Sequence, residues 1–332
     1  MNSFGTLFRV SVFGESHGQC VGVLIDGTPA GMSLNEEDLA VELAKRRPGG
    51  ALASPRKEED APSIMSGVFN GKTTGAPLLV LIENKDVDSS YYEEIRSTPR
   101  PGHADFTSAH KFRGFNDYRG GGHFSGRLTA GLVIAGAVAK KILAASNLVF
   151  KTKLVEAGGR EDIQTAIQEA RDKGDSIGGL VECTTDGLPV GLGEPFFDSV
   201  ESLLSHAIFS IPAVKGIEFG DGFASARMHG SDFNDTIIST SGKTAKKPAG
   251  GINGGLSHGN SLVFRVAFKA TSSISIPQKT MDIEKGELSE LRVRGRHDPC
   301  IALRAVPVVE CTAAIVLCDL MMLEQKIARV LR

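Results

Sequence analysis

Hydrophobic and polar residues alternate near the start of the chain in a pattern that predicts two short strands joined by a turn. Phe8, Val10 and Val12 fall on one side of a period-two pattern over residues 7–13, which is typical of a half-buried strand. Residues 21–27 are short, rich in β-branched side chains and closed by an Asp-Gly pair, so they predict a second strand that ends in a turn.

The turn between these strands reads Gly14-Glu15-Ser16-His17-Gly18, which matches the G-x-S-x-G pattern around the nucleophilic serine of many hydrolases. That pattern acts only where a strand turns into a helix, because this turn presents the hydroxyl beside an oxyanion hole. Here a strand is predicted to follow. The context therefore disfavours a serine hydrolase and leaves His17 as the reactive group of the turn.

Helical periodicity predicts an amphipathic helix after the second strand and a buried helix near the middle of the chain. Ser33-Leu34-Asn35-Glu36 indicates a capping box, and the helix that follows ends with Lys45-Arg46-Arg47 before a proline. Residues 127–145 are apolar nearly all round, so this helix should lie between two layers. The other predicted elements are helices over 161–173, 200–211 and 307–330 and strands over 63–69, 77–83 and 213–219. Strands, a polar turn and a long apolar helix thus recur in each half, which indicates an internal duplication.

Composition narrows the class of protein. The chain has 332 residues and a formal net charge of −2, so it lacks the excess of Lys and Arg typical of nucleic-acid binding, and we expect no nucleic-acid partner. It shows neither a signal-peptide pattern nor a run of about 18 uninterrupted apolar residues, which predicts a cytoplasmic protein with no membrane partner. Its five cysteines are scattered and lack C-x-x-C spacing, so we expect neither a disulfide framework nor a metal site.

A long polar segment, residues 100–127, precedes the buried helix and reads RPGHADFTSAHKFRGFNDYRGGGHFSGR. It is too polar for a core and too glycine-rich for a solvated helix. Gly120-Gly121-Gly122 leads through Ser125 toward the helix, where free backbone N–H groups at a helix N-terminus favour an anion. The glycines do not form G-x-G-x-x-G after a strand, so a dinucleotide site is disfavoured.

These motifs resemble, in the same order, those of the chorismate synthase family from Phe4 to about Leu323. The matching stretches are FGESHG at 13–18, RPGHAD at 100–105, GGG-x-x-S-x-R at 120–127, AVKGIEFGDGF at 213–223, KATSS at 269–273 and GRHDPC at 295–300. The resemblance implies a carbon–oxygen lyase of the shikimate pathway for aromatic amino acids. Such an enzyme converts 5-enolpyruvylshikimate 3-phosphate to chorismate and phosphate, with reduced FMN and no net redox change.

The resemblance also implies the architecture. We expect an α+β fold in which long buried helices lie between antiparallel sheets as a β-α-β sandwich, with a pseudo-twofold internal duplication. Residues 1–332 should form a single domain, and the protein should assemble as a homotetramer.

The implied reaction expels phosphate and removes hydrogen from C6, so it needs cations, a proton donor and a base. Carried over by motif position, His17 would protonate or hydrogen-bond the departing phosphate, and His103 would protonate or hold the reduced flavin near its pyrimidine ring. Asp298 would assist flavin N5 in taking the C6 proton. The implied substrate-binding residues are Ser16, Arg46, Ser125, Arg127 and Arg296. The implied cofactor-binding residues are His123, Phe124, Ser125, Asp232, Phe233, Gly254, Lys269, Ala270, Thr271, Ser272, Ser273 and Arg296.

Structural roles for these groups remain alternatives. A lone turn histidine is more often a hydrogen-bonded structural group, and Asp298 before Pro299 could shape a turn. Two other classes also stay open, a flavin-dependent oxidoreductase with net electron transfer and a non-enzymatic module that binds a phosphoglycan or nucleotide. The binding module would leave His17, His103 and Asp298 without a function.

The chain departs from the usual family pattern at two places. Many relatives carry GGGRSSAR, whereas this chain has His123 and Phe124 after the triple glycine. Position 52 is leucine where relatives usually place an arginine that contacts substrate or NADPH, and Arg56 or Lys57 could replace it. NADPH, which the family uses only as a reductant, is therefore expected to reduce the flavin poorly.

Overall fold

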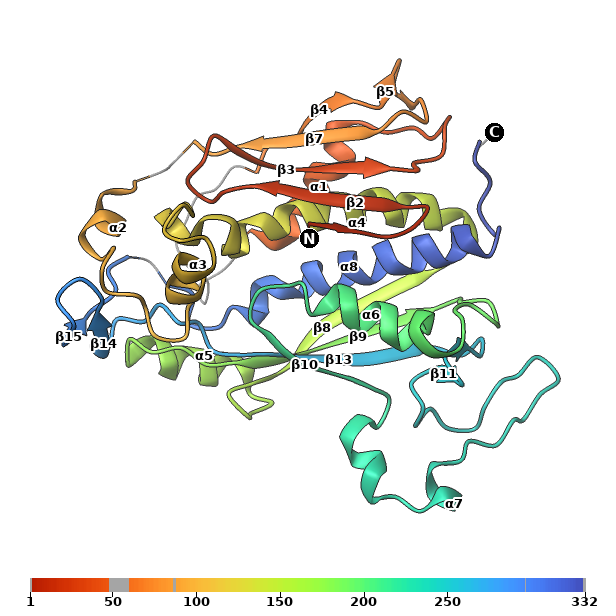
Figure 1. Ribbon diagram of the computed structural model, residues 1–332. Coiled ribbons are helices and arrows are strands. Elements are labelled where there is room, and N and C mark those ends of the chain that lie inside the picture. The colour runs from red at the N-terminus through yellow and green to blue at the C-terminus, as the bar shows by residue number, and fades with distance from the viewer. Residues whose placement is uncertain (1, 48–59, 86–87, 296, 331–332) are drawn as a thin grey trace.

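Two antiparallel sheets form the outer layers of the molecule (Figure 1). The computed structural model describes residues 2–47, 60–85, 88–295 and 297–330. The upper sheet has five strands in the order β1-β2-β3-β7-β4, and the lower sheet has four in the order β10-β13-β9-β8. The bounds are β1 Ser3–Phe4, β2 Arg9–Gly14, β3 Cys20–Asp26, β4 Ser63–Ser66, β7 Leu78–Glu83, β8 Val149–Ala157, β9 Gly179–Asp186, β10 Val214–Phe219 and β13 Leu262–Phe268.

Three helices fill the space between the sheets. Helix α4 (Thr129–Leu143) packs on β3 of the upper sheet, α8 (Ala302–Leu323) packs on β8 and β9 of the lower sheet, and the two helices pack on each other. Helix α1 (Glu36–Arg46) packs on both. The predicted arrangement of long buried helices between antiparallel sheets is therefore confirmed.

Shorter elements lie around this body. Helix α5 packs on β8, and α6 packs on α8 and β10. In the described part of the chain, three two-stranded ribbons and several short helices border the sandwich. Their bounds are α2 Ser90–Glu94, α3 Asp105–Lys111, α5 Ile163–Asp172, α6 Val200–Ile208, α7 Gly230–Phe233, β5 Val68–Phe69, β6 Lys72–Thr73, β11 Ile252–Asn253, β12 Leu256–Ser257, β14 Gln278–Asp282 and β15 Glu287–Leu291.

Some predicted helix ends were wrong, for identifiable local reasons. The N-cap of α1 is Asn35 rather than Ser33, and it forms a capping box with Asp38. Helix α8 begins before Pro307, which lies inside it and gives up one hydrogen bond. It ends at Leu323 because Gln325 adopts a left-handed conformation with φ 54° and closes a Schellman motif.

Among the described residues, two helices are long and apolar enough to cross a membrane by length and composition, Gly126–Ser146 and Ala302–Leu323. Of the most apolar window of each, 72% and 78% is buried inside the protein. Their apolar surfaces are therefore largely used in the middle layer of the sandwich.

Helices α4 and α8 approach closely at Gly136. A Cβ atom added to Gly136 would lie 2.1 Å from Cβ and 2.4 Å from Cα of Cys311, which is fully buried. Because the neighbour is a backbone and the root of a side chain, it cannot move aside without separating the helices. Glycine therefore sets the distance between the two core helices.

We expect Gly136→Ala to lower the free energy of unfolding by about 1–3 kcal/mol, the usual cost of overpacking. The gain in helix propensity, about 1 kcal/mol, should not compensate. Denaturant unfolding measures the difference, with Gly230→Ala as the control because no atom lies within 4 Å of its added Cβ. A Gly136→Ala protein as stable as the wild type would contradict this packing.

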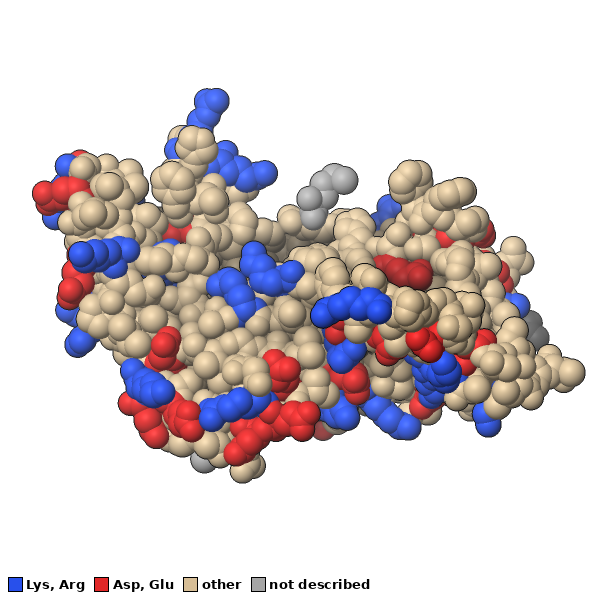
Figure 2. Space-filling model, turned by 90° about the horizontal axis from the view of Figure 1, so that it is seen from below, with Lys and Arg blue, Asp and Glu red and all other residues tan. Residues whose placement is uncertain are grey.

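The outer face of the lower sheet carries a row of alternating charges. Lys153, Glu182, Arg265 and Glu218 lie opposite one another on β8, β9, β13 and β10. Ion pairs join Lys153 to Glu182 at 3.6 Å and Arg265 to Glu218 at 3.1 Å. Figure 2 shows basic and acidic side chains interspersed on the lower face of the molecule rather than gathered by sign.

Candidate functional site

A triple glycine separates two histidines that are far apart in the sequence. Gly120, Gly121 and Gly122 all have positive φ, at 58°, 83° and 52°. A Cβ added to Gly120 would lie 2.3 Å from Cδ2 of His17, and one added to Gly121 would lie 3.0 Å from Cε1 of His103. Only glycine lets this backbone turn in the left-handed region and contact both imidazoles. The structure thus brings the two predicted catalytic histidines to one loop.

His17 lies in the turn between β2 and β3. Its Nδ1 is 2.9 Å from Oγ of Ser89, and its ring meets the ring of Tyr92 edge to face at 5.1 Å. The backbone N–H of Ser16 donates to the carbonyl of Gly122 at 3.1 Å, which ties the turn to the glycine loop. Since β3 follows the turn, Ser16 is not at a strand-to-helix elbow, and the prediction against a serine hydrolase agrees with this geometry.

The side chain of Asn84, at the end of β7, holds the same turn. Its amide donates to the carbonyls of Glu15 at 3.1 Å and Gly18 at 2.9 Å. Its oxygen accepts a hydrogen bond from Nε of Arg127 at 3.1 Å. One side chain therefore connects the histidine turn to a predicted substrate-binding arginine.

His103 is held by a carboxylate and an arginine. Its Nδ1 is 2.6 Å from Oδ1 of Asp105 and 3.1 Å from Nη2 of Arg100. Arg100, which is 6% exposed, donates to both oxygens of Asp105 at 2.7 and 2.8 Å. Burial would raise the pKa of Asp105, but hydrogen bonds from Arg100 and His103 outweigh it and hold that pKa well below its usual range. The ionised Asp105 fixes the orientation of the imidazole.

We expect Asp105→Asn to lower the free energy of unfolding at neutral pH by about 3 kcal/mol, because it leaves the buried Arg100 without its counter-ion. A carboxyl pKa that is lower in the folded than in the unfolded state stabilises the fold above the unfolded pKa of about 3.9. That contribution is lost as the pH falls below this value. The difference between wild type and Asp105→Asn should therefore be constant near neutrality and shrink in acid.

Denaturant unfolding at a series of pH values measures this difference. Asp198→Asn is the matched control, since Asp198 is exposed and outside the site. A difference between wild type and Asp105→Asn that stays the same down to the lowest pH would contradict the ion pair as its source.

Two predicted substrate-binding arginines converge on one buried carboxylate. Nη1 of Arg46 donates to Oδ2 of Asp60 at 3.0 Å, and Nη1 of Arg127 forms an ion pair with Oδ1 of the same residue. The side chains of Arg46 and Asp60 are only 5% and 1% exposed. Arg46 also donates to Thr129 Oγ1 at 3.1 Å, so α1 and α4 are joined here. The two cations are pre-positioned and largely shielded from water.

Asp298 lies just before α8 and pairs with an arginine on that helix. Its Oδ2 accepts a hydrogen bond from Nη1 of Arg304 at 3.0 Å. Nε of Arg304 donates to the carbonyl of Arg46 at 3.3 Å. The residue predicted to assist the flavin in taking the C6 proton is thereby linked to the end of α1 that carries the buried Arg46.

The segment Lys269 to Ser273 lies against the loop that carries His103. Nζ of Lys269 donates to Oγ of Ser272 at 2.7 Å, and that hydroxyl donates to the carbonyl of Gly102 at 2.7 Å. Nη1 of Arg100 donates to Oγ of Ser273 at 3.3 Å. Burial, followed by repulsion from Lys215, lowers the pKa of Lys269. A cation and several hydroxyls are therefore gathered beside the second histidine.

Other predicted site residues are not brought to this cluster within the chain. Asp232 and Phe233 belong to α7, and Gly254 lies in the turn between β11 and β12. Figure 1 places α7 and β11 at the opposite end of the molecule from α2 and α3. Arg296, like Leu52, Arg56 and Lys57, lies outside the described residues.

The two family departures after the triple glycine have structural partners. The ring nitrogens of His123 lie 3.1 Å from the carbonyl of Gly14 and 3.0 Å from Oδ1 of Asn2. Phe124 is 37% exposed and packs near the ring of Phe112. Ser125 accepts a hydrogen bond from the backbone N–H of Arg127 at 3.3 Å, as expected for a residue that begins a helix.

Comparison with known protein families identifies the family to which the chain belongs. A family model described as chorismate synthase matches residues 8–322. The chain belongs to the chorismate synthase family. A chorismate synthase of Chitinophaga pinensis is 58% identical over 332 residues and covers 100% of both chains. One of Dehalococcoides mccartyi is 48% identical over 361 residues, covering 100% of this chain and 99% of the relative.

Chorismate synthases also resemble the chain in three dimensions. A solved structure titled "Crystal Structure of Chorismate Synthase" superimposes with a TM-score of 0.75 at 26% identity, covering 97% of this chain and 93% of that one. Within the chain, the family motifs at 13–18 and 100–105 meet at the glycine loop of 120–127, and the motif at 269–273 contacts the segment 100–105.

Sequence reasoning missed the residues that orient the cluster. Asp60, Asn84, Arg100, Asp105 and Arg304 were not singled out, yet each contacts a predicted catalytic or substrate-binding residue. Asp105 had a usable signal, because it lies two positions after His103 in RPGHAD. The only sequence signal for Asn84 was its position at the end of a predicted strand. Asp60 had no such signal, because its two arginine partners come from different helices.

Proposed function

We propose that the chain catalyses the elimination of phosphate from 5-enolpyruvylshikimate 3-phosphate to give chorismate, with reduced FMN and no net redox change. The observation that carries the proposal is the packing of His17 and His103 against adjacent glycines of one loop. Asn84 connects the turn that carries His17 to Arg127, and Asp60 joins Arg127 to the buried Arg46. An acid, cations and a separate carboxylate are the groups that a phosphate elimination requires.

The chain's own residues would divide the work as follows. His17, whose ring is oriented by Ser89, would donate a proton to the departing phosphate. Arg46 and Arg127 would bind anionic groups of the substrate, and their low exposure strengthens such contacts. Asp298, paired with Arg304, would take part in moving the C6 proton. Ser16 and Arg296 would complete the substrate contacts.

The residues beside His103 fit a flavin. Thr271 has a buried hydroxyl without a hydrogen-bond partner among the described residues, and Lys269, Ser272 and Ser273 offer a cation and two further hydroxyls. Such a donor set suits the phosphate and carbonyl groups of FMN. His123, Phe124, Ser125 and Ala270 would complete this part of the site. When bound, reduced FMN would supply electron density to the reacting ring.

Assembly is the second part of the proposal. Asp232, Phe233 and Gly254 lie away from the other proposed flavin-binding residues of their own chain, on a part of the molecule with exposed apolar side chains such as Phe223 (77%) and Ile237 (69%). We propose a homotetramer in which these residues complete the site of a neighbouring subunit. Mixing inactive His17→Ala and Asp232→Ala proteins should then restore activity, because a mixed assembly contains some intact sites.

The proposal also covers the domain organisation, the internal duplication, the cellular location and the source of electrons for the flavin. The middle layer joins both sheets, which supports one domain over residues 1–332. One long helix at the end of each half, α4 and α8, supports an internal duplication with pseudo-twofold symmetry. We also propose a cytoplasmic enzyme without a membrane or nucleic-acid partner, and NADPH only as an inefficient source of electrons for the flavin. The interspersed charges of Figure 2 support the absence of a nucleic-acid surface on that face.

An anaerobic assay tests the function. The purified protein is given chemically reduced FMN and 5-enolpyruvylshikimate 3-phosphate, and chorismate absorbance and released phosphate are followed together. The proposal predicts that the two products rise in equal amounts. Phosphate release without chorismate, or neither product with folded protein and bound flavin, would contradict it.

A further inference from the structure

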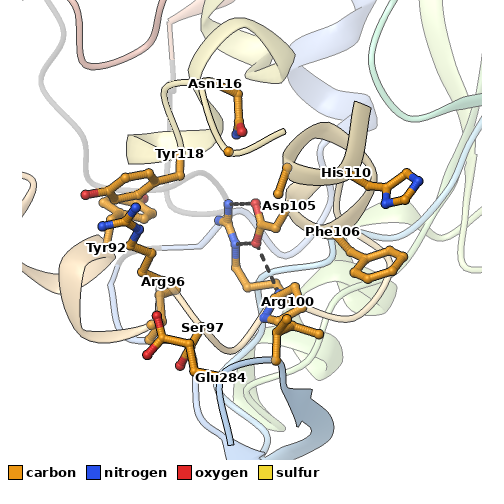
Figure 3. Close-up of a pocket in the computed structure, with 15 residues that line it drawn as sticks. Tyr92, Arg96, Ser97, Arg100, Asp105, Phe106, His110, Asn116, Tyr118 and Glu284 are labelled. Atoms are coloured by element: carbon orange, nitrogen blue, oxygen red, sulfur yellow. Dashed lines mark hydrogen bonds and ion pairs between the residues drawn. The ribbon is translucent and has the colours of Figure 1, made fainter. Parts of the chain in front are cut away.

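A cavity outside the proposed site lies between α2, α3 and the turn that joins β14 to β15. It has a volume of about 340 Å³, which is within the range of small-molecule sites. Figure 3 shows aromatic rings and charged groups from these elements around it. None of the catalytic or cofactor-binding residues proposed above lines it.

The cavity shares its inner wall with the site. The ion pair between Arg100 and Asp105 lines the cavity, and both residues also contact Nδ1 of His103. Tyr92 lines the cavity as well, with its ring against His17 and Arg100 over its face at 5.6 Å. A molecule in the cavity would therefore touch the groups that orient both histidines.

The lining indicates what such a molecule would be. The rings of Tyr92, Tyr118 and Phe106 offer apolar faces for a planar ring. Arg96 stacks over the ring of Tyr118 at 5.2 Å and has no carboxylate partner in the part of the chain that the structure describes. A guanidinium held on an aromatic face presents its donors in a fork that matches a carboxylate.

We propose that this cavity binds a small aromatic carboxylate, with the ring among Tyr92, Tyr118 and Phe106 and the carboxylate on Arg96. A ligand in this cavity contacts the Arg100–Asp105 pair and thereby changes the surroundings and orientation of the His103 imidazole. Glu284, an exposed carboxylate on the cavity's edge, would in addition receive an ammonium group, so an aromatic amino acid and an aromatic acid are the two forms of this ligand. Binding in this cavity does not depend on the function proposed above, since the residues that would hold the ligand are not among the proposed catalytic, substrate-binding or cofactor-binding residues.

Binding of three matched probes to the full-length protein tests the chemistry: phenylacetate, L-phenylalanine and the uncharged 2-phenylethanol. Titration calorimetry should give saturable binding of phenylacetate, with 2-phenylethanol weaker by about tenfold or more because the charged hydrogen bond is lost. Tighter binding of L-phenylalanine than of phenylacetate would identify the amino acid as the preferred form, and the reverse order would identify the simple acid. No saturable binding of either acid, or equal binding of 2-phenylethanol, would overturn the proposal.

Variants locate the site. Arg96→Gln should weaken phenylacetate by about tenfold or more, and Ala109→Phe should block it by filling the cavity while keeping the charge. Arg113→Gln, which removes a nearby exposed cation outside the lining, should leave binding unchanged. Binding that survives both cavity variants would overturn the assignment.

The coupling to His103 has its own readout. In protein with ¹³C-labelled histidines, the ring signal of His103, assigned with His103→Ala, should move in proportion to occupancy, while that of the exposed His206 should not. A His103 signal that stays still at saturating phenylacetate would overturn the coupling. Because this measurement needs neither flavin nor turnover, a failure here is distinct from a failure of the proposed reaction.

Discussion

Replacing His17 or His103 with alanine should lower turnover by roughly 100-fold or more and leave the fold intact. This is the usual scale for loss of a positioned acid or base. Both imidazoles lie at a polar loop rather than in the apolar core, with Ser89 holding one and Asp105 the other. Their removal should therefore cost little stability compared with its effect on the reaction.

Steady-state rates at saturating substrate and reduced FMN, with the melting temperature of each protein, measure the two effects separately. His206→Ala is the matched control, because His206 is exposed on α6 and its ring lies beside Phe4, away from the glycine loop. Wild-type turnover in well-folded His17→Ala or His103→Ala protein would remove that histidine from the mechanism.

Gly120→Ala should reduce turnover by a similar factor although it adds only one methyl group. The new Cβ would lie 2.3 Å from Cδ2 of His17 and 3.0 Å from Oγ of Ser16, so the imidazole must move. A displacement of about 1 Å at a reacting group can cost on the order of 100-fold in rate. The left-handed backbone at φ 58° adds a cost of roughly 1–2 kcal/mol in stability.

Gly126→Ala supplies the control for this substitution. Gly126 lies in the same segment, but its φ is not in the left-handed region and no atom lies within 4 Å of its added Cβ. It should keep nearly wild-type rate and stability. Equal rates for Gly120→Ala and Gly126→Ala would show that the contact between the loop and His17 does not matter for the reaction.

The alternation and periodicity of the sequence were enough to predict much of the fold. Strands around residues 7–13 and 21–27 and the buried helix over 127–145 are confirmed as β2, β3 and α4. In these segments the order of apolar and polar residues determines which face is buried, so the element can be predicted from the local sequence. The end of α8 was wrong because a left-handed Gln325, not a glycine or proline, terminates it.

The site was predictable only in part. Motif resemblance singled out His17, His103 and the triple glycine, and the structure places them in contact. The motif resemblance could not indicate that Asp60 pairs with both Arg46 and Arg127, since those partners come from segments far apart in the sequence. Carboxylates and amides that orient other side chains have no pattern of their own, because their role exists only once the chain has folded.

In the proposed reaction, the reduced flavin serves the elimination without being consumed. The most direct measurement supplies substoichiometric chemically reduced FMN to the protein with excess 5-enolpyruvylshikimate 3-phosphate under strict anaerobiosis, while the flavin spectrum and chorismate are recorded together. We predict many molecules of chorismate for each flavin, with the reduced spectrum regained when substrate is exhausted. Oxidation of the flavin in proportion to the substrate consumed, with a reduced product in place of chorismate, would contradict this proposal and indicate an oxidoreductase instead.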